Sequence, residues 1–253
     1  MIALVFPFQT ELEAFLAGLL NPGGTASDAP VDGGATAVHT LPKPLRHSSV
    51  KEERMGSLRT FTLESRSGWR LAVCGQGKVE AALTCQILAH VLQPSAFVLL
   101  GSACGLDDSV KAGDIVLADP CIEYDFQHGP PPPGAGSVPG PDHHPIFRSK
   151  HPLPGLGLPG MPVIRAGAVL SADRNVFEPD EKRTLQAAHG ALAAAWEGAG
   201  FHRFLRRNGA KGWELRLITE ESCEGRPTLE SLRGRMLEGF PALYPLVEAL
   251  AQK

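Results

Sequence analysis

The sequence predicts an α/β protein built on a largely parallel sheet. Several short apolar runs bounded by Gly, Asp or Pro have the length of strands that are covered on both faces. Between two of these runs, residues 78–92 carry apolar side chains at helical spacing, and this pattern ends before Pro94. A strand, a helix and a second strand in this order indicate a right-handed crossover between parallel neighbours.

The strand and helix patterns follow one another along most of the chain. Strands are expected at Ile2–Phe6, Leu58–Leu63, Trp69–Cys74, Ala96–Leu100, Ile115–Ala118, Val163–Val169 and Trp213–Thr219. Helices are expected at Lys78–Leu92, from Glu178 onward, and from about Leu229 to Ala251. The Ala-rich stretch at Ala187–Arg207 is ambiguous, because alanine has poor strand propensity and the pattern alone would make it one long helix.

Two polar, Gly-rich or Pro-rich stretches interrupt this alternation. Residues 21–57 separate the first strand from the next, and residues 129–160 contain a run of prolines that cannot donate to a sheet. Since the runs on either side look like strands of one sheet, we interpret both stretches as loop insertions in a single domain, 1–253, rather than as domain linkers. The second insertion is expected to be peripheral, with few buried residues.

Length, charge and cysteine usage limit the functions that this chain can have. Its 253 residues carry 24 basic and 27 acidic side chains, so the net charge of −3 gives no basic field to attract nucleic acids or anionic membranes. No stretch approaches the roughly 18 apolar residues of a membrane span, and the apolar start lacks the basic flank of a signal peptide. The five cysteines lack metal-ligand spacing. We therefore expect a cytoplasmic protein with reduced thiols and a small-molecule partner.

Three predicted strand ends carry polar residues where an open α/β sheet normally binds its ligand. Ser102 lies in GSACG, whose small residues let backbone amides approach a ligand; Glu11 follows the first strand; and Arg216 and Glu220 lie in RLITEES. Each has an ordinary structural explanation when taken singly, which is a tight turn, a helix start favouring carboxylates, and a solvated acidic turn.

Other motifs give weaker support to alternative chemistries. GQGKVEAAL at 75–83 lacks both the GxGxxG spacing and the Walker lysine followed by Ser or Thr, so a nucleotide-phosphate loop is not indicated. Ser102 lacks a GxSxG turn, which argues against a hydrolase triad. Asp142, His143 and His144 lie in the Pro-rich insertion without a rigid element to hold a metal. We expect neither a metal nor a cofactor.

The order of these motifs resembles that of one enzyme superfamily. The chain runs from an apolar strand and PFQTELEAFL through GQGKVEAAL, VLLGSACGLDDSVKAGDIVLAD, AGAVLSADRNVF, ALAAAWEGAGF and RLITEE. This succession resembles the nucleoside phosphorylase and nucleosidase superfamily, most closely its methylthioadenosine/S-adenosylhomocysteine nucleosidase branch. The resemblance implies one α/β domain with a central mixed, barrel-like sheet surrounded by helices, a homodimer, and Leu192–Trp196 as a buried strand.

The resemblance also implies an activity and a set of site residues. The activity is hydrolytic cleavage of the N-glycosidic bond of a purine nucleoside of the 5′-substituted adenosine type. Glu11 would activate water and Glu220 would protonate the base. The implied substrate-binding residues are Ser102, Ala103, Asn175, Trp196, Glu197 and Arg216.

Several departures from the family pattern leave alternatives open. Glu220 is one methylene longer than the family aspartate, Asn175 cannot stack on a base as the family's aromatic residue does, and Ala195 replaces a glutamate. One alternative is a nucleoside phosphorylase, including the type that releases adenine from adenosylated hopanoid lipids. A nucleoside-binding protein without turnover is the other alternative.

Overall fold

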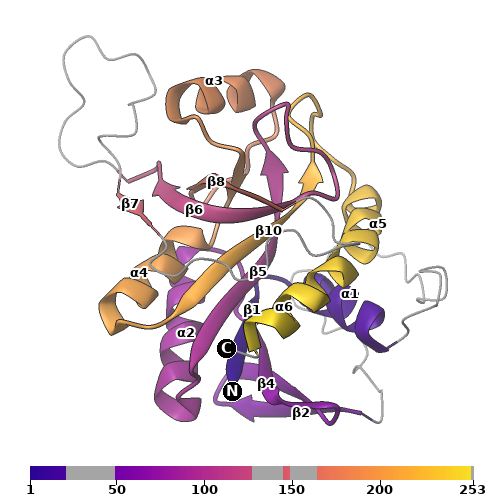
Figure 1. The fold of residues 1–253 in the computed structure, drawn as a ribbon. Helices are drawn as coiled ribbons and strands as arrows, with labels where there is room; N and C mark the ends of the chain where they lie inside the picture. The colour runs from indigo at the N-terminus through magenta and orange to yellow at the C-terminus, as the bar shows by residue number, and fades with distance from the viewer. Residues whose placement is uncertain (21–48, 127–144, 149–163, 252–253) are drawn as a thin grey trace.

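The computed structural model describes residues 1–20, 49–126, 145–148 and 164–251 (Figure 1). In chain order the elements are β1 (Ile2–Phe6), α1 (Gln9–Leu20), β2 (Val50–Met55), β3 (Leu58–Leu63), β4 (Arg66–Val73), α2 (Lys78–Leu92), β5 (Ala96–Gly105), β6 (Ile115–Glu123), β7 (Ile146–Phe147), β8 (Ile164–Ser171), α3 (Pro179–His189), β9 (Ala193–Ala195), α4 (Gly198–Asn208), β10 (Gly212–Glu220), α5 (Leu229–Gly239), the 3-10 helix η3 (Phe240–Leu243) and α6 (Tyr244–Ala251).

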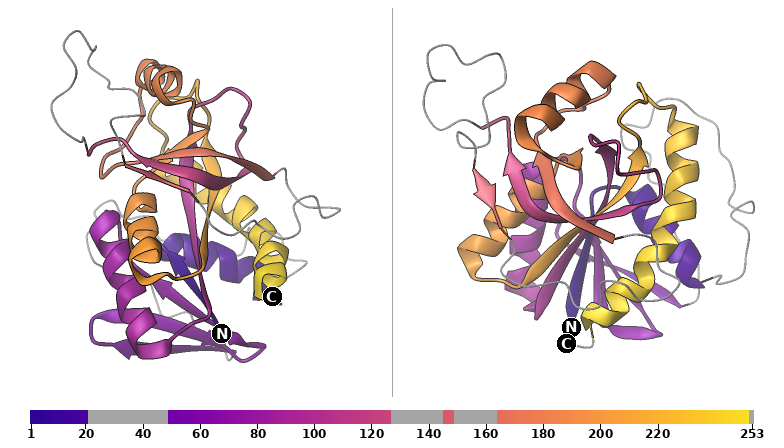
Figure 2. Two further views of the ribbon diagram at one scale, coloured as in Figure 1. Left: turned by 60° about the vertical axis from the view of Figure 1, so that its left-hand side comes forward. Right: turned by 45° about the horizontal axis from the view of Figure 1, so that its top comes forward.

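The strands form one mixed sheet that closes on itself around β5. This strand pairs in parallel with β1 and β10 and antiparallel with β9. From β10 the sheet continues through β6, β8 and β9 and returns to β5, while β1, β4, β3 and β2 extend from the other edge of β5 as an open sheet (Figures 1 and 2). The expected mixed, barrel-like sheet is therefore confirmed.

Helices cover both faces of the open part of this sheet. Helices α1, α5 and α6 bury one face of the strands together with Phe6, Phe15 and Phe240, and helices α2 and α4 bury the opposite face with Phe97 and Phe201. Strand β1 is buried along its whole length, which accounts for its continuous apolar sequence. No helix in the described part of the chain is long and apolar enough to span a membrane.

The segment at 21–57 contains a strand that the sequence analysis did not anticipate. Val50–Met55 forms β2 and pairs antiparallel with β3. Its sequence, VKEERM, is mostly charged, because β2 is an edge strand that faces solvent on most of its length, and such strands lack the apolar pattern. The rest of this expected insertion lies outside the described residues.

The expected closing helix from Leu229 to Ala251 is wrong as one element. It is divided into α5, η3 and α6. Pro241 supplies no backbone donor, and its ring packs against α1 at Gly18, where an added Cβ would lie 2.3 Å from the Pro241 Cβ. The turn of 3-10 helix therefore lets the chain change direction while α6 stays on the core.

The ambiguous Ala-rich stretch is resolved as strand followed by helix. Helix α3 ends at His189, its capping residue Gly190 adopts a left-handed conformation with φ of 62°, and β9 begins at Ala193. Strand β9 is buried between β8 and β5, where only small side chains are present. The strand expected at Leu192–Trp196 is thus found, with narrower limits.

The expectation that the Pro-rich insertion is peripheral can be tested at only four residues. Within 129–160 the structure describes 145–148, of which Phe147 is buried and the others are not. The candidate metal ligands Asp142, His143 and His144 lie outside the described residues. All five cysteines are free, and four of them are buried: Cys74, Cys85, Cys104 and Cys121.

Candidate active site

Glu11 is fully buried at the start of α1 and is fixed to β5. Its Oε2 accepts a hydrogen bond from the backbone N–H of Phe8 at 3.0 Å. Its Oε1 accepts from the backbone N–H of Ser102 at 2.7 Å and from the Ser102 hydroxyl at 2.8 Å. The first and fifth strands run in parallel, so their carboxyl ends bring these two residues together.

The environment of Glu11 suits proton transfer near neutral pH. Burial raises the pKa of Glu11 to about 7, and the negative charge of Glu197 acts in the same direction. The hydrogen bonds from Ser102 and Phe8 oppose this change, because they favour the ionised carboxylate. A carboxyl group with a pKa close to the ambient pH can act as a general base.

Glu197 and Arg216 form a buried ion pair beside Glu11. Glu197 follows β9 at the N-cap of α4; its Oε2 accepts from Arg216 Nη1 at 3.0 Å and its Oε1 from the backbone N–H of Gly77 at 3.3 Å. Arg216 Nη1 also lies 3.5 Å from the carbonyl oxygen of Ser102. Glu11, Ser102, Glu197 and Arg216 therefore meet at one point of the sheet, as the sequence predicts.

A glycine makes room for the guanidinium group. A Cβ added at Gly101 would lie 2.4 Å from Arg216 Nη1, so no other residue fits there without displacing the arginine. Arg216 is fully buried, and its Nη2 has no hydrogen-bond partner within the described residues. A buried N–H without a partner is costly, and it marks a position that a ligand or water can occupy.

Two further ionisable residues, Glu214 and His202, support this arginine and were not identified from the sequence. Glu214 Oε1 accepts from Arg216 Nε at 2.7 Å, and Glu214 Oε2 is 2.9 Å from His202 Nε2. Although burial acts to raise it, the charge of Arg216 and the hydrogen bond from His202 lower the pKa of Glu214 to about 2. One feature of the sequence could have indicated Glu214: it lies two residues before Arg216 in a strand that was expected to be buried on both faces.

Glu220 lies farther along β10, among different partners. A β-bulge separates it from Ile218, so the strict alternation of β10 is broken before Glu220. Its Oε2 is 3.8 Å from Nζ of Lys182, a fully buried lysine on α3, and has no hydrogen-bond partner within the described residues. Burial raises the pKa of Glu220, although Lys182 lowers it in part.

The segment after Glu220 is held by the same lysine. Lys182 Nζ donates to the carbonyl oxygens of Glu221 at 3.0 Å and Glu224 at 2.9 Å. The Glu224 carboxylate in turn pairs with Arg235 of α5. Lys182 was not identified from the sequence, because a lysine in the first half of an expected surface helix gives no sign of burial.

The remaining predicted residues are less closely engaged. Ala103 is buried on β5, and its carbonyl oxygen lies 3.4 Å from the Thr219 hydroxyl. The carbonyl oxygen of Trp196 accepts from the Ser171 hydroxyl at 2.7 Å, which fixes the main chain before Glu197. Asn175 is exposed, and the structure does not bring it to the cluster of Glu11, Glu197 and Arg216.

The GQGK turn is tied to the sheet by acidic residues. The backbone N–H of Lys78 donates to Asp173 Oδ1 at 2.8 Å, and Lys78 Nζ contacts Asp125 at 2.6 Å and Glu123 at 3.2 Å. A lysine neutralised in this way is poorly suited to bind a phosphate, in line with the sequence interpretation.

One group of metal-binding side chain types occurs in the described part of the chain. Donor atoms of Cys121, His202 and Glu214 lie within 4.8 Å of one another, and all three residues are buried. Both carboxylate oxygens of Glu214 already accept hydrogen bonds, one from Arg216 and one from His202. The Glu214 carboxylate is thus already satisfied by hydrogen bonds from protein groups.

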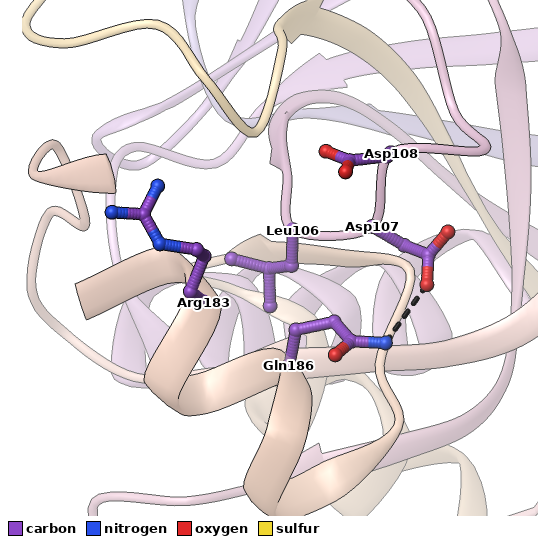
Figure 3. Close-up of a pocket in the computed structure, with 5 residues that line it drawn as sticks. All are labelled: Leu106, Asp107, Asp108, Arg183 and Gln186. Carbon is purple, nitrogen blue, oxygen red and sulfur yellow. Dashed lines mark hydrogen bonds between the residues drawn. The ribbon is translucent and has the colours of Figure 1, made fainter. Parts of the chain in front are cut away.

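Two cavities lie elsewhere on the chain. One, of about 330 Å³, is lined by Leu106, Asp107, Asp108, Arg183 and Gln186, and Figure 3 shows Gln186 donating to Asp107 across it. The other, of about 260 Å³, includes Glu224 and Arg235 and so adjoins the Glu220 cluster. Neither of these two cavities is lined by a predicted site residue.

Comparison with known proteins supports the resemblance that the motifs indicated. A profile of the Phosphorylase superfamily matches residues 34–238. The chain is 28% identical over 160 residues to a 5′-methylthioadenosine/S-adenosylhomocysteine nucleosidase of Thermotoga maritima, which covers 62% of this chain and 67% of that protein. A protein of the same name from Mycobacterium tuberculosis is 43% identical over 56 residues, which is 22% of either chain.

Solved structures share the whole fold at low sequence identity. The 5′-methylthioadenosine/S-adenosylhomocysteine nucleosidase of Campylobacter jejuni matches with a TM-score of 0.70 and 16% identity, covering 98% of both chains. The futalosine hydrolase of Helicobacter pylori matches with a TM-score of 0.70 and 16% identity, covering 99% of this chain and 97% of that one. At these identities the likeness shows the fold.

Proposed function

The chain belongs to the phosphorylase superfamily, and on that premise we propose that it hydrolyses the N-glycosidic bond of a purine nucleoside of the 5′-substituted adenosine type. Relatives named as nucleosidases support this activity. The observation that carries it is the fully buried Glu11, with a pKa of about 7, next to the Glu197–Arg216 ion pair. These groups combine a proton acceptor with fixed charge at one buried point.

In the proposed reaction a water molecule attacks C1′ of the ribose. Glu11 takes one proton from this water as its oxygen bonds to C1′, and the C1′–N bond breaks with its electron pair remaining on the base. Glu220 donates a proton to a purine ring nitrogen, so the base leaves as a neutral molecule. The products are the free base and the sugar with a hydroxyl at C1′.

Glu197 and Arg216 act on the sugar side of this reaction. Cleavage builds positive charge on the ribose ring, and anionic groups fixed nearby stabilise it. Glu197 is oriented by Gly77 and Arg216, and its carboxylate retains lone pairs to accept hydrogen bonds from the ribose hydroxyls. Within the described residues Nη2 of Arg216 has no hydrogen-bond partner and is available to donate to a ligand or water, whereas the Ser102 hydroxyl already donates to Glu11.

Glu220 is the proposed acid because burial raises its pKa, although the charge of Lys182, 3.8 Å from Oε2, lowers it in part. Oε2 has no hydrogen-bond partner within the described residues, so a proton on that oxygen is not donated to another group of the protein there. We propose that Ala103, Trp196 and Asn175 line the base and sugar. Asn175 is exposed in the single chain.

Two alternative functions are phosphorolysis and nucleoside binding without turnover. Phosphorolysis needs cationic groups for a phosphate, and Lys78 near this site is already paired with acidic side chains. A nucleoside-binding protein without turnover is suggested by the substitutions at Asn175, Ala195 and Glu220. Hydrolysis is favoured over both by the protonation behaviour of Glu11 and Glu220.

The decisive experiment is base release from a panel of nucleosides with and without phosphate, followed by chromatography. The panel contains 5′-methylthioadenosine, S-adenosylhomocysteine, adenosine and a 5′-adenosylated lipid analogue. Hydrolysis predicts base release that does not depend on phosphate. Release only with phosphate would identify a phosphorylase, and tight binding without release would identify a binding protein.

We also propose that the chain forms a homodimer in the cytoplasm. Val79, Leu83 and Val91 of α2 are 71%, 53% and 54% exposed, which supports burial of this helix in an interface. Five free cysteines fit a reducing compartment. Sedimentation or light scattering of the purified protein tests the dimer.

A further inference from the structure

Two buried ionisable residues have no part in the proposed reaction. Glu214 is fully buried on β10, and His202 is nearly so on α4. They are joined at 2.9 Å through Glu214 Oε2 and His202 Nε2, while Glu214 Oε1 accepts from Arg216 Nε at 2.7 Å. A continuous chain of hydrogen bonds thus runs from His202 through Glu214 and Arg216 to Glu197.

The surrounding backbone is shaped to admit this chain. A Cβ added at Gly198 would lie 2.6 and 2.7 Å from the two carboxylate oxygens of Glu214 and 2.9 Å from Cys121 Sγ. The His202 ring stacks on Phe147, with ring centres 6.2 Å apart and planes 19° apart. Contacts on both sides therefore hold the imidazole and the carboxylate in one arrangement.

Glu214 compensates the buried positive charge of Arg216. A buried guanidinium group needs compensation, and Glu197 would supply it alone if Glu214 were absent. With Glu214 present, Arg216 has a carboxylate of its own, and Glu197 keeps negative charge to direct at the ligand. The two contacts at Nε and Nη1 also fix the plane of the guanidinium group, which determines where the unpartnered Nη2 points.

We infer that Glu214 and His202 are positioning residues that hold Arg216 in the orientation and charge state that the site requires. Glu214 orients Arg216 directly, and His202 orients Glu214. The expected loss of turnover in variants of these residues rests on the proposed function. The expected change in the pKa of Glu11 does not.

Several ionisable groups face Arg216 and Glu11 in this region. They are Glu11 on α1, Cys74 after β4, Cys121 on β6, Glu197 and His202 on α4, and Glu214 on β10. Loss of the Glu214 charge leaves the positive charge of Arg216 less compensated. That change stabilises the ionised form of Glu11 and so lowers its pKa.

The test compares Glu214→Gln, His202→Leu and His202→Gln with Cys121→Ala as the matched control. Cys121 contacts the same cluster but carries no charge at neutral pH. With the best nucleoside, Glu214→Gln is expected to lower kcat by about 10–100-fold and to move the ascending limb of the pH profile to lower pH. His202→Leu should lower kcat by about 10-fold, and His202→Gln, which keeps an N–H donor, should restore it to within about threefold.

A second measurement does not depend on activity. Titration of the Glu11 carboxyl by ¹³C NMR, assigned by its loss in Glu11→Gln, should show a lower pKa in Glu214→Gln and no change in Cys121→Ala. The inference is overturned if the Glu11 titration and the kinetics of Glu214→Gln match the wild type, or if elemental analysis finds a metal ion that depends on Cys121 and His202. If the wild type cleaves no nucleoside, the proposed function fails while the NMR titration still decides the inference.

Discussion

Glu11 Oε1 accepts two hydrogen bonds from the single residue Ser102, one from its backbone N–H at 2.7 Å and one from its hydroxyl at 2.8 Å. The contact joins the start of α1 to β5. Both bonds favour the ionised carboxylate, whereas burial favours the protonated one and raises the pKa of Glu11 to about 7. Ser102 therefore influences the pH at which Glu11 can accept a proton.

Replacing Ser102 by Ala should raise the pKa of Glu11, because one of the bonds to the ionised form is removed. A hydrogen bond of about 1 kcal/mol corresponds to a change of somewhat less than about one pKa unit. The ascending limb of kcat/KM against pH should move to higher pH by that amount. Ser95→Ala, just before the first residue of β5, is the control and should leave the profile unchanged. An unmoved limb in Ser102→Ala would contradict this coupling.

Removing either proposed proton-transfer group should reduce turnover far more than binding. Loss of a general acid or base commonly lowers the rate by about 10²–10⁴-fold, and this range is expected for Glu11→Gln and for Glu220→Gln. Binding of a C-nucleoside analogue, which cannot be hydrolysed, should stay within about threefold of the wild type, because both variants keep the shape of the side chain. Normal turnover in Glu220→Gln would move the role of acid to its neighbour Glu221.

Glu11 should also make folding stability depend on pH. Its pKa in the folded protein, about 7, lies above the ordinary value of 4.5, so the stabilisation from this group is complete below pH 4.5 and is lost as pH rises through 7. Above that pH the ionised buried group lowers stability by about 3 kcal/mol. Glu11→Gln should therefore be more stable than the wild type at pH 8 and similar at pH 5 in urea titrations. Glu80→Gln, on the exposed face of α2, should show no such difference between the two pH values.

Lys182 should control the protonation of Glu220. Its positive charge lowers the pKa of a carboxyl group that burial raises, so Lys182→Met should raise that pKa further. The descending limb of the pH profile, where the acid loses its proton, should then shift to higher pH. The variant also leaves two carbonyl oxygens without a donor, at a cost of about 1–3 kcal/mol each. Lys182→Arg, which keeps the charge, should restore the limb; equal limbs in the two variants would contradict the assignment.

Gly101 should not tolerate a side chain. Gly101→Ala places a methyl group 2.4 Å from Arg216 Nη1, so the guanidinium group must move away from Glu197. Overpacking of this kind costs about 1–3 kcal/mol, and kcat should fall together with thermal stability. Gly68→Ala is the control, since nothing lies within 4 Å of an added Cβ there. Wild-type kinetics in Gly101→Ala would show that the position of Arg216 is not critical.

The sequence was most informative where a motif has one structural meaning. Apolar runs identified most strands, and their ends carried Glu11, Ser102 and Arg216. The resemblance to the nucleoside phosphorylase and nucleosidase superfamily added Glu197 and implied a common site for these four residues, which the structure brings together. The edge strand β2 was missed because a solvent-facing strand carries charges instead of alternating apolar residues. The break before α6 was missed because a proline in a helical pattern can bend a helix or end it, and only its packing decides which.

The residues that support the site could not be predicted from the sequence, for a different reason. Lys182 contacts carbonyl groups 39 and 42 positions away, and His202 contacts Glu214 on another element, so no local pattern connects these pairs. Glu214 lies only two positions from Arg216 on β10, but that spacing does not show that the two charges are buried together. Each is an ordinary surface residue type that becomes buried only when α3, α4 and β10 assemble. Burial of charge is a property of the tertiary arrangement, and a single sequence does not display it.

The position of β5 between β1, β10 and β9 has a consequence for how the molecule opens. Its first half is paired on both sides by β1 and β10, and its end is paired by β10 and β9, so its amides are released only when several elements separate at once. In a hydrogen-exchange experiment we expect the β5 amides to exchange last, by global unfolding, and those of the edge strand β2 to exchange early, by local fraying. Ser102 lies on this slowest-exchanging strand, so its side chain should stay in position while other elements unfold locally.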